Sequence, residues 1–562
     1  MMNIKDVYKS FRFLVSGDIK KKLVFFLGIS FLFLFFNLFS FSLLIPFFSS
    51  LIEPSLINEL NFFKKLKQFN FLKANTNEEI LRFVGLFSLI MIIFSNYLLY
   101  LNEKFKFQLI TSIAKSITSK FITAFLKIRF SDFLKYKKNL VISKLLIELE
   151  SVVIQIFYNF LELVSRIFIV LVIFTALLFF EPLITIISFF SIILIFIIVY
   201  SFFKIKFRKL GIKMVEGNSE RSLYLNEIIS NFLNIKINNL EDYFKNLFLK
   251  ATNKYYDNLA SSEVTKKIPK SMIEATFFSV IILISIMLLR NDFSNMKNLI
   301  LSFSAFALAS YKIMPSIQQI FFSISTIKNT IPKLYSLSNE LKKINKAKKI
   351  TFSDQKVNFQ QNPIIVAKNL YFSFNNKIII SKLNFTIKKN SIVCISGKSG
   401  SGKTTLLNCI LGLIKSNKGN ISVCGKNPFN LSDKLISQIF SYAPQLTSLF
   451  HFSLKKNIHL NNPYLDFKLK ECLKFSNFSK LNLLKFKDLK RNLSGGEIKR
   501  ILISRAIYND SNIIIMDEPT AYLDEKNAQI VIKNIKLLKN KTIIFTTHNE
   551  KLKKIADQII KL

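Results

Sequence analysis

The chain has 562 residues, of which half are hydrophobic, and a formal net charge of +44. This length exceeds one ordinary domain, and a mean hydropathy of +0.34 is high for a soluble protein. The charge is compatible with nucleic acid, but no recognition motif for nucleic acid accompanies it, and basic residues also gather on the cytoplasmic side of membrane proteins; we therefore expect a membrane protein of two or more domains with no nucleic-acid partner.

Six stretches of the first half are apolar over about 20 residues, the length that crosses a bilayer as a helix. They are 23–46, 81–101, 152–179, 183–203, 271–289 and 299–326. The first has a longer apolar core than a cleaved signal peptide, so it is expected to remain as a permanent helix. Glu181-Pro182 suits a tight hairpin between the third and fourth. We predict an α-helical six-span transmembrane domain over residues 1–334.

Lysine and arginine are frequent at the N-terminus and in the long segments 103–150 and 204–267. Because such residues mark the cytoplasmic side of a membrane, these segments are expected to extend the spans into the cytoplasm as helices. The segment 52–80 is then external. Its apolar residues at helical spacing predict an amphipathic helix along the outer surface, although its own lysines weaken the charge argument for that loop.

Few charged residues lie within the predicted spans. Glu162 and Arg166 are four residues apart on one helix face, so they either pair with each other or serve a function. Lys312 stands nearly alone in the sixth span, and Lys270 and Glu274 open the fifth. Ionisable groups inside a membrane are functional candidates, so Arg166, Lys270 and Lys312 are the candidate substrate-binding residues.

The polar segment 335–360 is predicted to link the membrane domain to a second domain over residues 361–562. There the apolar run SIVCIS (391–396) leads into GKSGSGKTT (397–405) and then into the periodic LLNCILGLI. Strand, glycine-rich loop and helix in this order predict a phosphate-binding loop, whose backbone N–H groups surround phosphates. Lys403 is expected to contact the β- and γ-phosphates, and Thr404 to hold Mg²⁺.

Two more buried strands end in polar side chains. NIIIMDEP (512–519) ends in Asp517 and Glu518, and TIIFTTH (542–548) ends in His548. Asp517 is expected to coordinate Mg²⁺, Glu518 to polarise an attacking water, and His548 to sense the γ-phosphate. The alternatives are a helix cap for the two carboxylates and a structural role for the histidine.

The four cysteines all lie beyond residue 390 and form no close pair or Cys/His cluster. Metal binding through them is therefore not expected. We predict reduced, buried thiols.

These motifs, with LSGGE (493–497), resemble the ATP-binding cassette of ABC transporters. The first half resembles the six-span membrane domain of exporter-type members, with NEIISNFLNIKINNLED (226–242) similar to its second intracellular extension. The resemblance covers nearly the whole chain. It implies a transmembrane domain fused to an α/β P-loop NTPase domain, ATP and Mg²⁺ as cofactors, and a bacterial inner membrane with the cassette in the cytoplasm.

The resemblance also implies a role for each motif residue. Phe374 occupies the place of the aromatic that stacks on adenine, Gln445 that of the Q-loop glutamine near Mg²⁺, and Asp524 that of the D-loop. The other nucleotide-binding residues are Gly397, Lys398, Ser399, Gly400, Ser401, Gly402, Lys403, Thr404, Thr405, Ser494, Gly495, Gly496 and Glu497. Since the LSGGE of one cassette closes over ATP held by another, a homodimer is implied, with a heterodimer of related chains as the alternative.

Several positions depart from the family pattern. Phe374 replaces the usual tyrosine, and Asn390 stands where glycine often precedes the loop strand. The D-loop reads Ala521-Tyr522-Leu523 in place of Ser-Ala-Leu, and KFKDLKRN (485–492) keeps Asp488 as its only acid before the signature. These departures bear on coupling and leave ATP binding intact.

The expected substrate rests on a shorter resemblance. IPKSMIEATFF (268–278) and the external stretch 52–80 are similar to parts of bacterial flippases of lipid-linked oligosaccharides, which handle a polyprenyl pyrophosphate carrying sugars. Basic groups near the cavity would suit that head group. Export or flipping of such a lipid by alternating access is therefore predicted. The alternatives are a general lipid, multidrug or peptide exporter, and an ATP-gated channel.

Overall fold

A computed structural model describes residues 17–52, 77–134, 136, 141–142, 144–178, 182–288, 296–347, 357–374, 377–445, 449–478 and 493–562. The chain forms two compact units. The first comprises Met1–Ile128 and Tyr136–Lys348, and the second comprises Arg129–Lys135 and Lys349–Leu562.

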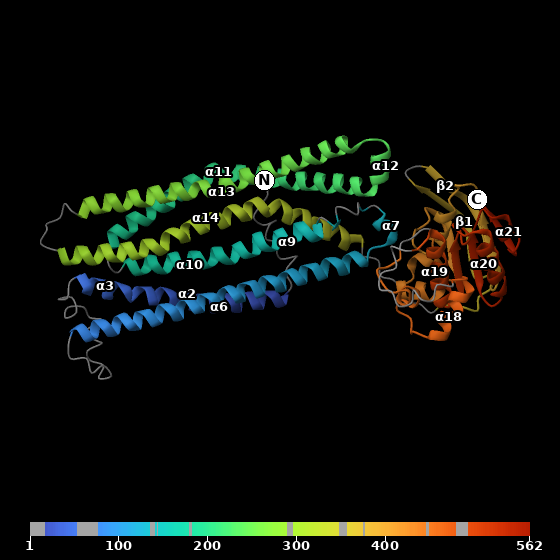
Figure 1. The fold of residues 1–562 in the computed structure, drawn as a ribbon, viewed down its shortest axis with the longest axis horizontal. Helices are drawn as coiled ribbons and strands as arrows, with labels where there is room; N and C mark the ends of the chain where they lie inside the picture. Colours follow the sequence, from blue (N-terminus) through green and yellow to red (C-terminus); the bar gives the residue numbers. More distant parts are fainter. Residues whose placement is uncertain are drawn as a thin grey trace. The chain divides into compact units, whose positions relative to one another are not determined.

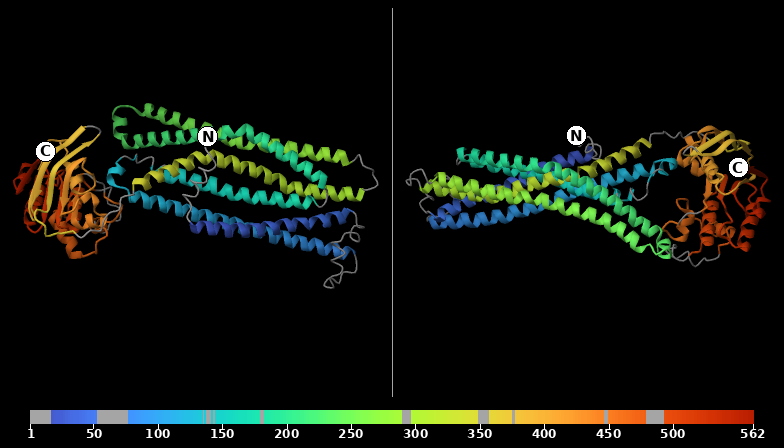
Figure 2. Two further views of the ribbon diagram at one scale, coloured as in Figure 1. Left: turned by 180° about the vertical axis from the view of Figure 1, so that it is seen from behind. Right: turned by 90° about the horizontal axis from the view of Figure 1, so that it is seen from above.

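The first unit consists of long helices (Figure 1). They are α2 (Gly17–Ser42), α3 (Leu44–Ile52), α6 (Asn77–Leu126), α10 (Asn159–Leu178), α11 (Pro182–Ser230), α12 (Phe232–Ile237), α13 (Glu241–Leu288) and α14 (Met296–Ala347). Helix α10 follows the π-helical segments η1 (Lys144–Glu148) and η2 (Val153–Tyr158), between which lies α9 (Leu149–Val152). Helices α2 and α6, α10 and α14, and α11 and α13 pack side by side (Figure 2).

Four described segments are long and apolar enough to cross a membrane, and they correspond to the first four predicted spans. They are Lys21–Ser40, Glu78–Leu126, Lys144–Leu178 and Thr185–Phe203. The fifth and sixth predicted spans lie within α13 and α14, which include side chains outside the described set. The predicted external helix falls mostly on residues 53–76, which also lie outside the described residues.

The predicted helical extensions of the spans are confirmed by α6, α11 and α13, which continue well beyond their apolar stretches. Close approach of α11 and α14 requires a residue without a side chain. A Cβ on Gly211 would stand 2.1 Å from the carbonyl oxygen of Asn329. Small residues allow such backbone contacts between membrane helices.

The end of α14 differs from the predicted linker. Residues 335–347 were expected in the linker 335–360, but they continue the helix to Ala347 and belong to the first unit. Leucine and isoleucine recur there at helical spacing, and these side chains are buried in one apolar cluster: Leu334, Leu337, Leu341 and Ile344. Burial of this stripe outweighs the polar composition that suggested a linker.

The second unit contains a parallel five-stranded sheet of order β5-β6-β7-β3-β8 and an antiparallel sheet of order β2-β1-β4. The parallel strands are β3 (Ile392–Ser396), β5 (Phe440–Ala443), β6 (Ile513–Asp517), β7 (Thr542–Thr546) and β8 (Gln558–Lys561). The antiparallel strands are β1 (Ile365–Phe374), β2 (Lys377–Ile387) and β4 (Lys418–Val423). The three strands predicted at 391–396, 512–519 and 542–548 are confirmed as β3, β6 and β7.

Helices cover the parallel sheet (Figure 1). The described helices of this unit are α15 (Lys403–Ile410), α16 (Asp433–Ile439), α17 (Leu454–His459), α18 (Asp466–Phe475), α19 (Gly495–Tyr508), α20 (Glu525–Leu537) and α21 (Glu550–Lys553), of which α17 and α18 pack against α19. Strands buried on both faces explain the continuous apolar runs in the sequence. The four cysteines are free and buried in this unit, as predicted.

The second unit also includes a short segment from the first half of the chain, with α7 (Phe130–Phe133). The guanidinium of Arg129 lies 3.7 Å from the ring centroid of Phe429. Burial lowers the pKa of Arg129, while the carboxylates of Asp132 and Asp433 act in the opposite direction. The guanidinium is thus stacked on an aromatic face with carboxylates nearby, an arrangement that favours arginine over lysine.

Candidate functional site

The predicted phosphate-binding loop connects β3 to α15 at the carboxyl end of the parallel sheet. Gly400 and Gly402 have φ values of 79° and 96°, which residues with side chains rarely adopt. A Cβ on Gly400 would meet nothing within 4 Å among the described residues, so the loop has open space beside it. Ser401 Oγ is buried and has no hydrogen-bond partner among the described residues. The open space beside the loop and the unpartnered hydroxyl of Ser401 therefore fit a phosphate group.

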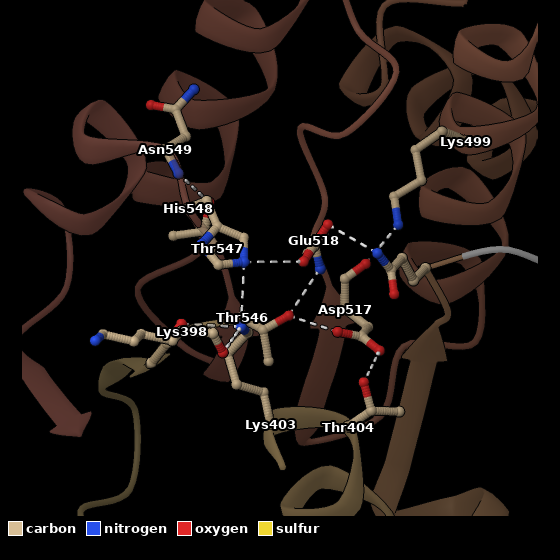
Figure 3. Close-up of polar contacts among 12 residues, drawn as sticks. Lys398, Lys403, Thr404, Lys499, Asp517, Glu518, Thr546, Thr547, His548 and Asn549 are labelled. Carbon is tan, nitrogen blue, oxygen red and sulfur yellow. Dashed lines mark hydrogen bonds and ion pairs between the residues drawn. The ribbon is translucent and has the colours of Figure 1, made fainter. Parts of the chain in front are cut away.

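Lys403 and His548 are brought together beside this loop (Figure 3). Lys403 Nζ donates to the carbonyl oxygens of Gly397 and Lys398 at 3.0 and 3.1 Å. It also lies 3.1 Å from His548 Nε2. A phosphate on the loop would accordingly meet a lysine from α15 and a histidine that follows β7.

Thr404 and Asp517 meet at the adjoining strand end. Thr404 Oγ1 donates to Asp517 Oδ2 at 3.2 Å, and Thr546 Oγ1 donates to Asp517 Oδ1 at 2.5 Å. Asp517 is buried and ends β6. A carboxylate and a hydroxyl beside a phosphate loop are oxygen ligands of the kind that Mg²⁺ prefers, with water and phosphate filling its other positions. These residues fit the predicted Mg²⁺ site.

Glu518 accepts a hydrogen bond at one carboxylate oxygen and has His548 near the other (Figure 3). Gln445 Nε2 donates to Glu518 Oε2 at 2.9 Å, and His548 Nε2 lies 3.6 Å from Glu518 Oε1. The backbone N–H of Glu518 donates to Thr546 Oγ1 at 2.9 Å, and its φ is 48°. Asp524 is the N-cap of α20, the helix that follows, so the capping alternative does not account for Glu518.

Lys499 is a site residue that the sequence reasoning missed. It lies on α19, and its side chain is 1% exposed. Its Nζ donates to the carbonyl oxygens of Pro444 at 2.8 Å and Asp517 at 2.6 Å. Burial lowers the pKa of Lys499 to about 8, against the opposing effect of the Asp517 and Glu518 carboxylates. The ammonium thus joins the ends of β5 and β6.

The signature LSGGE begins α19. Ser494 is its N-cap: Ser494 Oγ accepts from the Glu497 N–H at 3.3 Å, and Glu497 Oε2 accepts from the Ser494 N–H at 2.8 Å. This reciprocal pair is a capping box. Glu497, predicted to bind nucleotide, is buried and takes part in this cap, whereas Ser494 and Gly495 are exposed. The exposed N–H end of this helix is suited to an anion.

The predicted D-loop lies against the signature. A Cβ on Gly496 would stand 2.5 Å from the carbonyl oxygen of Tyr522. Tyr522 itself is 57% exposed and has a φ of 63°. The departure from the family pattern therefore adds an exposed aromatic ring beside the signature glycines.

The remaining predicted residues of this unit are placed as follows. Phe374 ends β1 and is 60% exposed, so its ring is accessible for stacking. Asn390, which stands where glycine is frequent, has a φ of 59°, a left-handed conformation that asparagine tolerates better than most residues. The stretch 485–492, with Asp488, lies outside the described residues. Ser399 lies in the loop and Thr405 in the first turn of α15.

One candidate residue of the membrane unit, Arg166, belongs to an ionic cluster with Glu162, Lys106 and Glu103. Arg166 Nε donates to Glu162 Oε1 at 2.7 Å, so these residues do pair, which is one of the two alternatives that the sequence left open. Lys106 Nζ, which the sequence reasoning missed, donates to Glu162 Oε2 at 2.6 Å and to Glu103 Oε1 at 2.5 Å. Lys312 Nζ donates to the side-chain oxygen of an asparagine on α2, Asn37, at 3.0 Å. The side chain of Lys270 lies outside the described set.

Comparisons with known proteins agree with both units. The family profile described as "ABC transporter transmembrane region" matches residues 27–311, and the profile described as "ABC transporter" matches residues 380–521. An ABC transporter ATP-binding/permease protein of Haemophilus influenzae is 27% identical over 271 residues, which are 46% of this chain and 49% of that protein. An iron chelatin transport ATP-binding protein of Helicobacter pylori is 35% identical over 183 residues, 31% of this chain and 71% of that protein.

A solved structure of a bacterial Atm1-family ABC exporter with ATP bound is similar over 97% of this chain and 94% of its own, with a TM-score of 0.78 and 14% identity. This similarity shows the fold, a helical transmembrane region fused to an α/β cassette, as predicted. The matched region spans about half the length of the Haemophilus relative. ATP-binding domains of this kind couple ATP hydrolysis to transport. Matched in its transmembrane region and in its ATP-binding domain, the chain belongs to the ABC transporter family.

Proposed function

We propose that this chain is one subunit of a homodimeric, ATP-driven exporter of the bacterial inner membrane, with its cassette in the cytoplasm. One observation carries the proposal. The phosphate loop, the Thr404–Asp517 pair and the Gln445–Glu518 pair converge at the carboxyl ends of neighbouring parallel strands. Ligands of open α/β sheets bind at this edge.

In this proposal the side chains of the site divide the tasks of binding and hydrolysis, and Gln445 has two of them. Lys403 and the loop N–H groups bind the phosphates, and Thr404, Asp517 and Gln445 hold Mg²⁺. The metal, when bound, neutralises negative charge on the phosphates. Glu518 accepts a proton from the attacking water, and His548, whose Nε2 lies 3.6 Å from Glu518 Oε1, donates to the γ-phosphate. Gln445, bonded to Glu518 at 2.9 Å, keeps that carboxylate oriented.

The role of Glu518 is tested by Glu518→Gln. We expect ATP binding, measured with a fluorescent analogue, to remain while turnover falls about 10²- to 10⁴-fold, the range for loss of a general base. Glu525→Gln is a matched control, because Glu525 is an exposed acid of the same region that pairs with Lys551. Hydrolysis at the wild-type rate in purified Glu518→Gln would remove Glu518 from this role.

The homodimer follows from the exposed Ser494 and Gly495, which in the proposal bind ATP held by the loop of the other subunit. Mixed dimers of a Lys403→Ala subunit and a Ser494→Arg subunit should contain one intact composite site. Differently tagged subunits permit their isolation. If the mixed dimers bind ATP no better than either parent homodimer, the composite site is wrong.

For the substrate we propose an amphipathic lipid with an anionic head group, most specifically a lipid-linked oligosaccharide. Support comes from the charges of the membrane unit. Lys106 and Arg166 bond to the carboxylate of Glu162, and Lys312 donates to the side-chain oxygen of Asn37, so three cationic side chains lie on the described helices α6, α10 and α14. Arg166 is the most accessible of the directly paired cations, with a side chain 36% exposed. Cationic side chains within a membrane suit an anionic partner such as pyrophosphate.

Stimulation of ATPase activity in liposomes separates the substrate classes. A polyprenyl pyrophosphate carrying sugars should stimulate more than the same polyprenol without phosphate, and Lys312→Gln should weaken that difference. Stimulation by neutral drugs or peptides alone would favour the general exporter instead. Downhill ion flux far above the rate of ATP turnover would favour a channel.

A further inference from the structure

The bonds of Lys499 reach the two strand ends that carry the proposed hydrolytic pair. Pro444, whose carbonyl accepts at 2.8 Å, directly precedes Gln445. Asp517, whose carbonyl accepts at 2.6 Å, directly precedes Glu518. The side-chain amide of Gln445 then donates to Glu518. The Lys499 ammonium therefore binds the backbone next to Gln445 and the backbone next to Glu518, and these two side chains are hydrogen-bonded to each other.

The carboxyl ends of β5 and β6 need a hydrogen-bond donor such as the Lys499 ammonium. Strands β5 and β6 are parallel neighbours whose register runs as far as Ala443 opposite Met516. The next residues, Pro444 and Asp517, lie beyond this β5–β6 ladder, although Asp517 still pairs with Thr546 of β7, and proline has no N–H with which to continue the ladder. A buried carbonyl without a donor is costly, so two carbonyls at a strand end require an outside partner. Lys499, 1% exposed, supplies N–H groups to both.

Lys499 also belongs to the helix that presents the signature. Ser494 caps α19, and the capping box holds its first turn rigidly. Lys499 lies little more than one helical turn further along the same helix. A displacement of α19 would therefore move the ammonium and, through its two bonds, the backbone of Gln445 and Glu518.

We propose that Lys499 is a positioning residue that couples the signature helix to the Gln445–Glu518 pair. The inference rests on the proposed roles of these two residues. Contact of the exposed signature with the partner subunit's ATP would fix α19, and α19 would fix the hydrolytic pair of its own subunit. Each subunit would thus hydrolyse its ATP efficiently only after its signature has engaged the other.

The test compares Lys499→Met, Lys499→Gln and the control Arg505→Met in the full-length protein in liposomes. Methionine preserves the aliphatic length and removes the donors, whereas glutamine retains two N–H donors without charge. Arg505 is on the same helix, partly buried, and donates to the Asn457 carbonyl at 2.7 Å, away from the site. Kinetic constants, the dissociation constant of a fluorescent ATP analogue and the melting temperature are measured for each.

We expect Lys499→Met to lower kcat about 10- to 100-fold, as for small misplacements of reacting groups, with KM and the ATP dissociation constant changed less than about threefold. Lys499→Gln should recover most of kcat, and Arg505→Met should keep it. If methionine does not yield folded protein, Lys499→Ala, which leaves room for water beside the carbonyls, should show the same loss of kcat.

Three results would overturn the inference: wild-type kcat in Lys499→Met, an equal loss in Arg505→Met, or a change confined to KM. Glu518→Gln distinguishes this failure from failure of the proposed function. An inactive Glu518→Gln beside a fully active Lys499→Met removes only the role of Lys499. An active Glu518→Gln removes the hydrolytic assignment itself.

Discussion

Replacement of Glu162 by glutamine should destabilise the membrane unit by about 3 kcal/mol. Glu162 is 4% exposed and accepts from Lys106 and Arg166. Removing one partner of a buried ion pair costs about 3–5 kcal/mol, because the other charge stays in apolar surroundings. The lower end applies here, since Arg166 is 36% exposed and can be solvated, and Lys106 keeps Glu103 at 2.5 Å.

The assay has to report mainly on the membrane unit. The chain has no tryptophan, and its four cysteines lie in the second unit, so tryptophan fluorescence and thiol dyes do not follow this change. The long helices of the membrane unit contribute most of the far-UV circular dichroism, with a smaller part from the shorter helices of the second unit, so its thermal loss in detergent mainly follows the membrane unit. For about 3 kcal/mol we expect the melting temperature of the Glu162→Gln variant to fall by about 5 °C, scaling from the size of the unit.

A double variant gives the sharper comparison. In Glu162→Gln with Lys106→Met the buried cation is removed as well, so the double variant should be more stable than Glu162→Gln alone. Lys106→Met alone should cost less than Glu162→Gln, because Glu162 keeps Arg166. A wild-type melting temperature in Glu162→Gln, or a double variant whose loss equals the sum of the two single losses, would refute the buried ionic cluster.

Three further outcomes are expected. Gly496→Ala should keep ATP binding but lower ATP turnover about tenfold or more, since its Cβ would stand 2.5 Å from the Tyr522 carbonyl oxygen. The control Gly28→Ala, whose Cβ meets nothing within 4 Å among the described residues, should turn over ATP at the wild-type rate. Equal turnover in the two variants would contradict the clash. Phe374→Ala should weaken ATP binding about tenfold and Phe374→Tyr should not, because stacking contributes roughly 1–3 kcal/mol; unchanged binding in the alanine variant would exclude stacking. Burial raises the pKa of Cys409 from 9.0 to about 12, so at pH 8 its thiolate is about a thousandfold less populated than that of an ordinary cysteine. Maleimide, followed by mass spectrometry, should therefore label Cys409 only after unfolding. Rapid labelling of the native protein would contradict this expectation.

Features that depend on local order were predictable. A strand, a glycine-rich loop and a helix follow one another at 391–410, and their geometry depends on neighbours in sequence. The strand-end acids and His548 were placed correctly because parallel strands bring their carboxyl ends to one edge. The end of α14 was not predicted from the sequence. Polar residues dominate 335–347 by number, while a stripe of buried leucine and isoleucine side chains determines its structure.

Both missed lysines required knowledge of tertiary contacts. Lys106 meets Glu162 from another helix, and Lys499 meets carbonyls from two strands. A signal for each was nevertheless present. Positions 109, 110 and 113 after Lys106, and positions 502, 503 and 506 after Lys499, are apolar and buried at helical spacing. A lysine within an apolar stripe lies on the buried face, where its charge requires partners.

The signature motif combines features set by local sequence with features set by tertiary contacts. Its exposed Ser494 and Gly495 were expected to act on a nucleotide, and their position at the free N-terminus of α19 suits that role. Glu497 instead closes the capping box, so the last residue of the motif serves the rigidity of the helix. Lys499 then bonds that rigid helix to the carbonyls beside Gln445 and Glu518. A motif without a catalytic group can thereby govern hydrolysis within its own subunit, and Lys499→Met separates this effect from ATP binding because the phosphate loop is untouched.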